Sequence, residues 1–237
     1  MTSEIIEAKA KGAKQAFRAT EKSLITSVGQ YQWRLFSPQC RCYLATAEQT
    51  YMHLAGEGSE NRDLSLIGME LCKALEFEIN RVFVVPFRAY LGSGITEFLA
   101  TEHTGTRKNQ PTYFTFLSKV VDEENYPEVQ TLTLGQFLFV LKQTLNDEYS
   151  LQSYKRFLNE LRPGIWLDLN RKFIAKLNTV TNGYRNSIVH NSPMSQKQCD
   201  HLRELIFADK DALLSKVVGY TNMKSVVKPK QYKEVLM

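Results

Sequence analysis

Apolar residues recur at steps of three and four between residues 64 and 83, and this pattern restricts the fold more than any other in the chain. Side chains at these spacings lie on one face of an α-helix, and the stripe extends over about six turns, so it predicts a core helix. No alternating run of apolar and polar residues is long enough to predict a strand, so we expect an all-α fold. The stripe consists of Leu64, Ile67, Leu71, Leu75, Ile79, Val82 and Phe83.

Other segments carry helix signals as well. Ser37-Pro38 predicts a helix start, with serine as N-cap and proline at the first helical position, and this helix should run to about residue 54. A second long helix is expected after Pro163-Gly164, leading to Arg185 and His190. The Ser-x-x-Gln sequence at 195–198 has the form of a capping box that opens a last helix to about residue 218. Further helices are predicted over residues 4–28, 113–121, 134–145 and 151–161.

The predicted helices divide into three parts along the 237 residues. Residues 1–60 are expected to form an N-terminal helical extension with a docking or regulatory role. Residues 61–218 are expected to form a helical bundle, and residues 219–237 a basic C-terminal tail. No apolar run approaches the roughly 18 residues that cross a bilayer, and no signal-peptide pattern is present, so we expect a cytoplasmic protein without a membrane partner. The four cysteines lack metal-site or disulfide spacing and are expected to be reduced thiols, mostly in the core.

Positive charge is concentrated in the last third of the chain. The net charge is +5 overall, but it is −4 for residues 61–150, +5 for residues 151–190 and +3 for residues 191–237. A basic segment with few acidic residues attracts polyanions and makes their binding salt-dependent, as expected for a nucleic-acid ligand. The simpler alternative is a solvated basic helix face without a partner.

Residues 184–190, Tyr-Arg-Asn-Ser-Ile-Val-His, hold the strongest candidates for chemistry. Arg185 offers a permanently charged, forked donor for a phosphate, and His190 can exchange a proton near neutral pH. Asn186 and His190 are four residues apart and share a helix face, whereas Arg185 lies about 140° from His190 around an ideal helix. The two cations could meet if the helix ends before His190, as Asn191-Ser192-Pro193 suggests, or if a second copy contributes its own pair across a two-fold axis.

These side chains could cleave RNA without a metal or cofactor. The ribose 2′-hydroxyl supplies the nucleophile, so the protein needs a base, an acid and a cation near the phosphate. His190 could serve as base or acid, and Arg185 could stabilise the developing negative charge. Products would end in a 2′,3′-cyclic phosphate, and DNA would not be cut. The alternative is a structural Arg and His that cap the core or join an interface.

The Arg-Asn pair followed by three residues and His, at the end of a long helix, resembles the signature of the HEPN superfamily. Residues 73–78, Lys-Ala-Leu-Glu-Phe-Glu, are similar to the first core helix of several HEPN families, and the resemblance covers roughly residues 60–218. It implies a HEPN-like helical bundle that forms a homodimer through its motif face. It also implies Arg185, Asn186 and His190 as catalytic positions.

The activity implied by the resemblance is metal-independent endoribonuclease activity in a toxin or antiviral-defence effector, with a regulatory protein as a further partner. HEPN members that pair with nucleotidyltransferase antitoxins often have a tyrosine two residues after the histidine. Here that position is Ser192, which argues against regulation by tyrosine nucleotidylation. The alternative function is a catalytically inactive helical subunit of a defence complex that binds RNA or protein.

Several other residues are weaker candidates for the site. Glu76 is a possible partner for the Arg185 guanidinium, on its side away from the substrate. Glu76 and Glu78 are two residues apart on a helix and face different ways, which argues against an acid/base pair. Tyr31, Trp33 and Phe36 could stack on bases, but a hydrophobic docking strip is the favoured interpretation. The remaining histidines lie on separate elements without metal-ligand spacing, so no metal site is expected; they are His53, His103 and His201.

Overall fold

A computed structural model gives the arrangement of most of the chain. Every regular element among the described residues is helical, which confirms the predicted all-α class. The predicted tail beyond residue 220, the start of the first predicted helix and the predicted start of the second long helix lie outside these residues. The structure describes residues 17–54, 62–101, 112–122, 130–145, 152–161, 169, 171–190 and 192–220.

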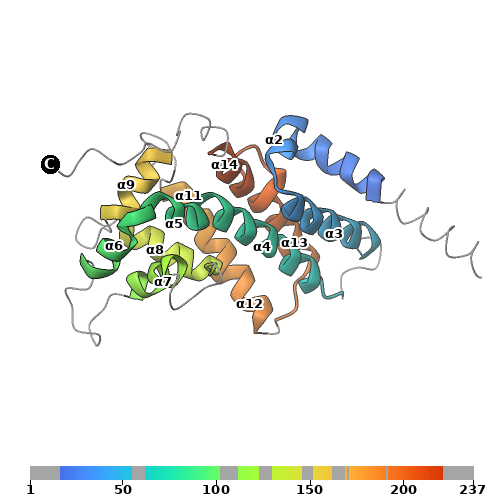
Figure 1. The fold of residues 1–237 in the computed structure, drawn as a ribbon. Coiled ribbons are helices and arrows are strands. Elements are labelled where there is room, and N and C mark those ends of the chain that lie inside the picture. Colours follow the sequence, from blue (N-terminus) through green and yellow to red (C-terminus); the bar gives the residue numbers. More distant parts are fainter. Residues whose placement is uncertain are drawn as a thin grey trace, which may run out of the picture.

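One long helical run crosses the molecule (Figure 1). It consists of α4 (Ser65–Ile79), the π-helical η2 (Asn80–Val84) and α5 (Val85–Leu91). The helix continues past Pro86, whose ring crowds the carbonyl one turn earlier and which has no N–H to donate. The wider π-turn directly before the proline accommodates it. The predicted stripe is the core face of this run, since Leu64, Ile67, Leu71, Leu75, Ile79, Val82 and Phe83 are at most 1% exposed.

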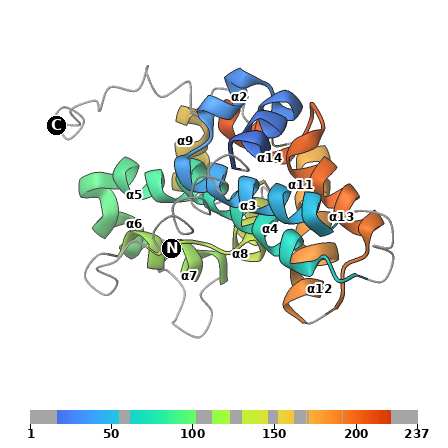
Figure 2. The same cartoon turned by 90° about the vertical axis from the view of Figure 1, so that its right-hand side faces the viewer.

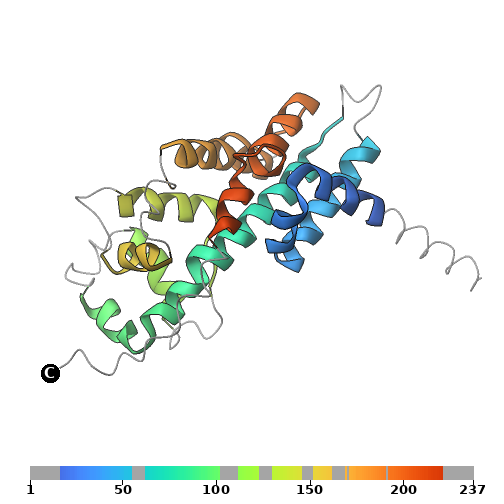
Figure 3. The same ribbon diagram turned by 90° about the horizontal axis from the view of Figure 1, so that it is seen from above.

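The N-terminal helices cover one side of the long run (Figure 3). Residues 17–28 are helical, Gly29 breaks the helix with a φ of 86°, and α2 (Gln30–Leu35) and α3 (Pro38–Leu54) follow. Ser37 accepts a hydrogen bond from the N–H of Cys40 at 3.1 Å, as expected for the predicted N-cap. These helices share the core of the bundle through Leu24, Val28, Trp33, Phe36, Cys40 and Leu44. The domain boundary at residue 60 stays a prediction.

The C-terminal helices cover the other side of the long run. The predicted capping box is confirmed, because the side chain of Ser195 and that of Gln198 each accept from the other's backbone N–H. The single last helix predicted to residue 218 is wrong: a turn closed by Ala212 N–H to the Asp209 carbonyl, 2.9 Å, interrupts it. The elements are α11 (Arg171–Asn178), the π-helical η5 (Thr179–Arg185), α12 (Asn186–Val189), α13 (Gln196–Arg203), the π-helical η6 (Glu204–Ala208) and α14 (Leu213–Gly219).

A group of shorter helices packs at the far end of the long run, opposite α12 (Figure 2). Phe87 of α5 lies at the centre of their aromatic contacts, with its ring centroid 5.0 Å from that of Tyr154 and 5.4 Å from that of Phe157. The helices predicted over 113–121, 134–145 and 151–161 are confirmed to within one residue. The elements are η3 (Gly92–Gly94), α6 (Ile95–Thr101), α7 (Thr112–Val121), α8 (Leu134–Leu145) and α9 (Gln152–Leu161).

The helical stretch Ser65–Leu99 is long and apolar enough to cross a membrane by length and composition alone, with 35 residues and a mean hydropathy of 1.2. One such helix is weak evidence of a membrane span, because the core helix of a soluble protein has the same length and composition. Its α4 part is a core helix, with the apolar stripe packed inside the bundle.

Candidate functional site

The candidate motif lies where a long helix ends. Arg185 is the last residue of η5 and Asn186 the first of α12, so both stand on a continuous helical run. α12 ends at Val189, and His190 follows with φ −91° and ψ 23°. The predicted end of the helix near Asn191 is therefore confirmed. His190 is exposed, whereas Arg185 and Asn186 are half-buried.

One long hydrogen bond joins the arginine and the amide of the motif. Arg185 Nη1 donates to Asn186 Oδ1 at 3.4 Å. The Arg185 charge also reaches Cys72 on α4: burial first and Glu76 second raise the pKa of that thiol to about 12, against a lowering by Arg185. No hydrogen bond or ion pair joins Arg185 to His190 within the part of the chain that the structure describes. The helix end therefore does not bring the two cations into contact within one copy.

The segment after His190 is fixed by the first turn of α4. Asp63 Oδ1 accepts hydrogen bonds from the backbone N–H of Met194 at 3.0 Å and of Ser65 at 2.9 Å. Leu64 N–H donates to the Met194 carbonyl at 2.9 Å, and the Ser65 hydroxyl donates to the Ser192 carbonyl at 3.2 Å. These contacts bracket the exposed His190 between the rigid α12 and a tethered chain.

A row of asparagines precedes His190 on the same helix, and the sequence analysis did not single it out. Asn186 Nδ2 donates to Asn182 Oδ1 at 3.2 Å, and Asn182 Nδ2 donates to Asn178 Oδ1 at 3.1 Å. Lys142 of α8 donates to the same Asn178 oxygen at 2.9 Å. The spacing Asn-x₃-Asn-x₃-Asn-x₃-His could have revealed the row, because residues four apart neighbour each other on a helix.

Tyr184, the residue before Arg185, anchors the motif helix to α13. Its hydroxyl lies 2.5 Å from His201 Nδ1, and the two ring centroids are 5.9 Å apart at an interplanar angle of 67°. Burial raises the pKa of Tyr184. His201 therefore has a structural partner, and this contact fixes the rotation of η5 around its axis.

Glu76 points away from the motif, toward a different part of the fold. Its Oε2 accepts the backbone N–H of Leu134 at 2.9 Å, at the N-terminus of α8. No hydrogen bond or ion pair joins Glu76 to Arg185 among the described residues. Glu78 faces the other way, since it is fully buried and accepts from Ser37 N–H at 2.7 Å and from Arg81 Nε at 2.6 Å. The two glutamates thus face different elements, as their spacing predicted.

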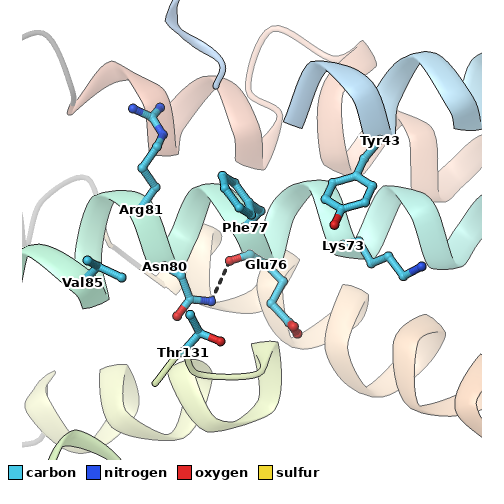
Figure 4. A pocket seen from close by; sticks show the side chains of 8 residues that line it. All are labelled: Tyr43, Lys73, Glu76, Phe77, Asn80, Arg81, Val85 and Thr131. Carbon is cyan, nitrogen blue, oxygen red and sulfur yellow. Dashed lines mark hydrogen bonds between the residues drawn. The ribbon is translucent and has the colours of Figure 1, made fainter. Parts of the chain in front are cut away.

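Glu76 also lines a cavity of about 370 Å³ between α3, the long helical run and the segment before α8 (Figure 4). The cationic side chains at its edge have acidic partners: Lys73 Nζ lies 2.8 Å from Glu70, and Arg81 is paired with Glu78. Asn80 is bonded to the carbonyls of Glu76 and Leu132 at 2.8 Å each. The cavity's charged side chains and Asn80 are therefore engaged in holding the fold, and the motif residues do not line it.

The remaining candidates lie apart from one another. Within the described ranges no three His, Cys, Asp or Glu side chains come close enough to share a metal ion. His53 is exposed at the end of α3, and His103 lies outside the described residues. Trp33 and Phe36 are 3% and 2% exposed, so their rings pack in the protein's own core and are not available to stack on a base.

Comparison of the chain with protein-family models, with curated proteins and with solved structures finds no match in any of the three. The chemistry of the motif therefore follows from the groups that it presents. These groups are the guanidinium of Arg185, which is bonded to the Asn186 amide, and the exposed imidazole of His190. A row of asparagine amides leads from them to Lys142.

Proposed function

We propose that this chain is a metal-independent endoribonuclease that cleaves RNA by attack of the ribose 2′-hydroxyl. The observation that carries the proposal is the motif at the end of the helix, where Asn186 holds Arg185 and His190 stands exposed directly beyond. An exposed imidazole can exchange a proton with a bound substrate, which is worth on the order of 10²–10⁴ in rate. A braced guanidinium can stabilise the charge that develops on the phosphate.

The motif residues would divide the steps of the reaction. His190 removes the proton from the 2′-hydroxyl while water protonates the 5′-oxygen that leaves, or His190 protonates the 5′-oxygen while water takes the proton of the 2′-hydroxyl. Arg185 binds the phosphate oxygens, and Asn186 keeps its guanidinium from turning away. The reaction yields a 2′,3′-cyclic phosphate and a free 5′-hydroxyl. The HEPN resemblance supports the same assignment and favours a toxin or antiviral-defence effector as the biological role.

We further propose that the active form is a homodimer. Arg185 and His190 lie about 140° apart on an ideal helix, so one copy alone presents them in different directions. Two large apolar side chains are exposed on the elements that carry the motif and its tether: Leu66 on the first turn of α4 is 63% exposed, and Val189 of α12 is 47% exposed. Their burial against a second copy would place Arg185 of each copy nearer to the other's histidine.

The second candidate is a helical RNA-binding or protein-interaction subunit of a defence complex, without catalytic activity. The observation that favours it is the lack of contact between Arg185 and His190 in the described part of one copy. Such a protein would bind RNA and release no product.

The decisive experiment incubates the purified protein with tRNA and with a labelled single-stranded RNA in excess EDTA. We expect cleavage that ends in 2′,3′-cyclic phosphate, and loss of that cleavage in Arg185→Ala and in His190→Ala. Matched controls are Arg34→Ala and His53→Ala, which remove exposed residues of the same types from α2 and α3. RNA binding without product by the wild type would favour the noncatalytic subunit.

The dimer is tested separately by light scattering coupled to size exclusion. Leu66→Glu and Val189→Glu should each give a monomer with unchanged helicity and strongly reduced cleavage. Met52→Glu is the matched control, because Met52 is 51% exposed on α3. A wild-type protein that is monomeric at working concentration and still cleaves RNA would rule the dimer out.

A further inference from the structure

The asparagine row forms a continuous line of polar groups that ends at His190. Asn178, Asn182, Asn186 and His190 follow one another at four-residue steps, and the three amides are joined by hydrogen bonds of 3.1 and 3.2 Å. Lys142 is bound to the far end of the line through Asn178. The hydrogen bonds therefore run from a cation on α8 to Asn186, one helical turn before the exposed His190.

The π-helical segment η5 keeps this row straight. In a regular α-helix, successive four-residue steps drift by about 40° around the axis, so a long row would wind out of line. η5 covers residues 179–185, and Asn186 N–H bonds to the Thr181 carbonyl five residues earlier. The wider turn offsets the drift between Asn178 and Asn186. π-turns inside α-helices are uncommon and frequently occur at functional sites.

Gly183 lies within this segment, and packing does not require a glycine there. It is exposed, and a Cβ added to it would meet nothing nearer than Thr179 Cγ2 at 3.9 Å. Glycine weakens a helix interior, and a position with room for a side chain gains nothing in packing from lacking one. Gly183 does leave the backbone beside the row open to close approach by a ligand.

The charge and the aromatic content of this surface fit a nucleic acid. Neither α8 nor residues 171–190 contain an Asp or Glu, so no acidic residue of these helices repels a polyanion. Phe139 is 37% exposed and lies three residues before Lys142, on the same side of α8, and the ring of Phe116 of α7 meets its ring edge to face at a centroid distance of 6.2 Å. A cation beside an exposed ring is the combination that holds the phosphate and base of a single strand.

We propose that this row is a binding track for single-stranded RNA. One phosphate binds Lys142, a base stacks on Phe139, and the chain passes over Asn178 and Asn182 toward the phosphate at His190. The amides offer N–H groups to phosphate oxygens and to base edges, which are accessible only in unpaired RNA. The track rests on the proposed ribonuclease function and names its substrate class.

Binding is measured apart from cleavage with a fluorescein-labelled 2′-O-methyl oligonucleotide of about twelve nucleotides, whose blocked hydroxyl prevents the reaction. Fluorescence anisotropy gives Kd at several salt concentrations. We expect the double variant Asn178→Ala/Asn182→Ala to weaken binding about tenfold. Lys142→Ala should lower the salt dependence of log Kd by about one phosphate contact. Matched controls on α9 are Asn159→Ala and Lys155→Ala, which should bind as the wild type does.

Gly183→Ala separates binding from folding. The added methyl group should raise Tm, because alanine favours the helix and the site has room for it, yet it should weaken RNA binding by blocking the backbone. A substitution that only disturbed the fold would lower both Tm and the affinity for RNA. If Gly183→Ala binds RNA as tightly as the wild type or more tightly, RNA does not approach the backbone at Gly183.

The outcomes distinguish the track from the proposed catalysis. Row variants that raise KM for RNA cleavage and Kd for the blocked oligonucleotide, with kcat nearly unchanged, support both. A wild type that cleaves RNA while the row variants bind and cleave normally overturns the track and leaves the catalysis standing. Row-dependent binding by a protein that never cleaves RNA overturns the catalysis and leaves the track. Absence of RNA binding by the wild type overturns the track.

Discussion

Asp63 accepts a hydrogen bond from the backbone N–H of Met194 at 3.0 Å, across a sequence separation of 131 positions. The same carboxylate oxygen accepts from the N–H and hydroxyl of Ser65, so it satisfies the first backbone N–H of α4 and also tethers the segment after His190. These three hydrogen bonds, that of the Ser65 hydroxyl first, lower the pKa of Asp63. The position of His190 thus depends on a carboxylate at the start of a different helix.

Asp63→Ala should lower the free energy of unfolding by about 1 kcal/mol, the usual cost of a lost cap. Because the folded pKa lies below the unfolded value of about 3.9, this stabilisation is present above pH 4 and disappears as the pH falls through the folded pKa. Urea unfolding of both proteins at neutral and acidic pH measures the difference. Asp122→Ala at the end of α7 is the matched control. If the free energies of unfolding of wild type and Asp63→Ala differ more at acidic pH than at neutral pH, the stabilising role of Asp63 is contradicted.

Arg203 of α13 is paired with Glu48 of α3 at 2.7 Å and lies over the ring of Tyr51 at 3.8 Å. Glu48 is buried, so Arg203→Ala would leave its charge without a partner and should destabilise the fold by about 3 kcal/mol. The double variant Glu48→Gln/Arg203→Met removes both charges at similar volume and should recover much of that loss. Thermal unfolding measures both effects. Equal destabilisation by the single and double variants would show that packing, rather than the unpaired charge, decides the cost.

The sequence predicted the features of this fold that depend on nearby residues. The apolar stripe, the Ser37 cap and the capping box at Ser195 each involve groups within a few positions of one another, so their spacing is visible in the chain. The π-turns were not predicted, because a shift from four-residue to five-residue hydrogen bonding depends on packing against other helices. The break in the last helix was missed for a similar reason: residues 209–212 carry no proline or glycine to mark it.

The candidate site was predictable in part. The four-residue spacing predicted that Asn186 shares a helix face with His190, whereas the hydrogen bonds of its side chain are made to Arg185 and Asn182. The side-chain partner of Glu76 was not predictable, because the N-terminus of α8 is 58 positions away. Trp33 and Phe36 were predicted as a surface strip, yet both rings are buried in the core, because α2 packs against α14, which is far away in the sequence.

Cys42 should be the only cysteine that reacts rapidly with a thiol reagent in the folded protein. It is exposed, whereas the other three thiols are buried, and burial raises the pKa of Cys72 and of Cys199 to about 12. Titration with a chromogenic disulfide at about pH 8 should give one fast equivalent, and four in denaturant. Cys42→Ser should abolish the fast phase, and a fast phase that persists would show that a second thiol opens to solvent.

The raised pKa values of Cys72 and Cys199 predict that the fold loses stability at alkaline pH. A thiol kept neutral by burial stabilises the fold fully below its ordinary pKa, and that contribution is lost as the pH rises through the folded value. We therefore expect the free energy of unfolding to fall from about pH 9 upward. In the double variant Cys72→Ala/Cys199→Ala, the free energy of unfolding should fall less steeply above about pH 9, as measured by urea unfolding. The stability of this variant at neutral pH should be lower than that of the wild type. A profile as steep as that of the wild type would exclude these thiols as its source.

Gly68→Ala tests whether α4 positions the motif. A Cβ at Gly68 would lie 2.7 Å from Ile188 Cδ1 and 2.7 Å from Met194 Cε, one on each side of His190. Both atoms are ends of flexible side chains, so we expect a modest destabilisation of about 1 kcal/mol. Cleavage should fall by a larger factor, because α12 and the tethered segment must move apart around the imidazole.

The control for this variant is Gly219→Ala at the end of α14, where an added Cβ meets no atom within 4 Å. It should not lower the free energy of unfolding, and it should leave cleavage unchanged. Initial rates on labelled RNA and urea unfolding of the same preparations give the comparison. If Gly68→Ala lowers stability and leaves the cleavage rate unchanged, the contact between α4 and α12 supports the fold alone. A rate that falls further than stability would assign to α4 the placement of His190.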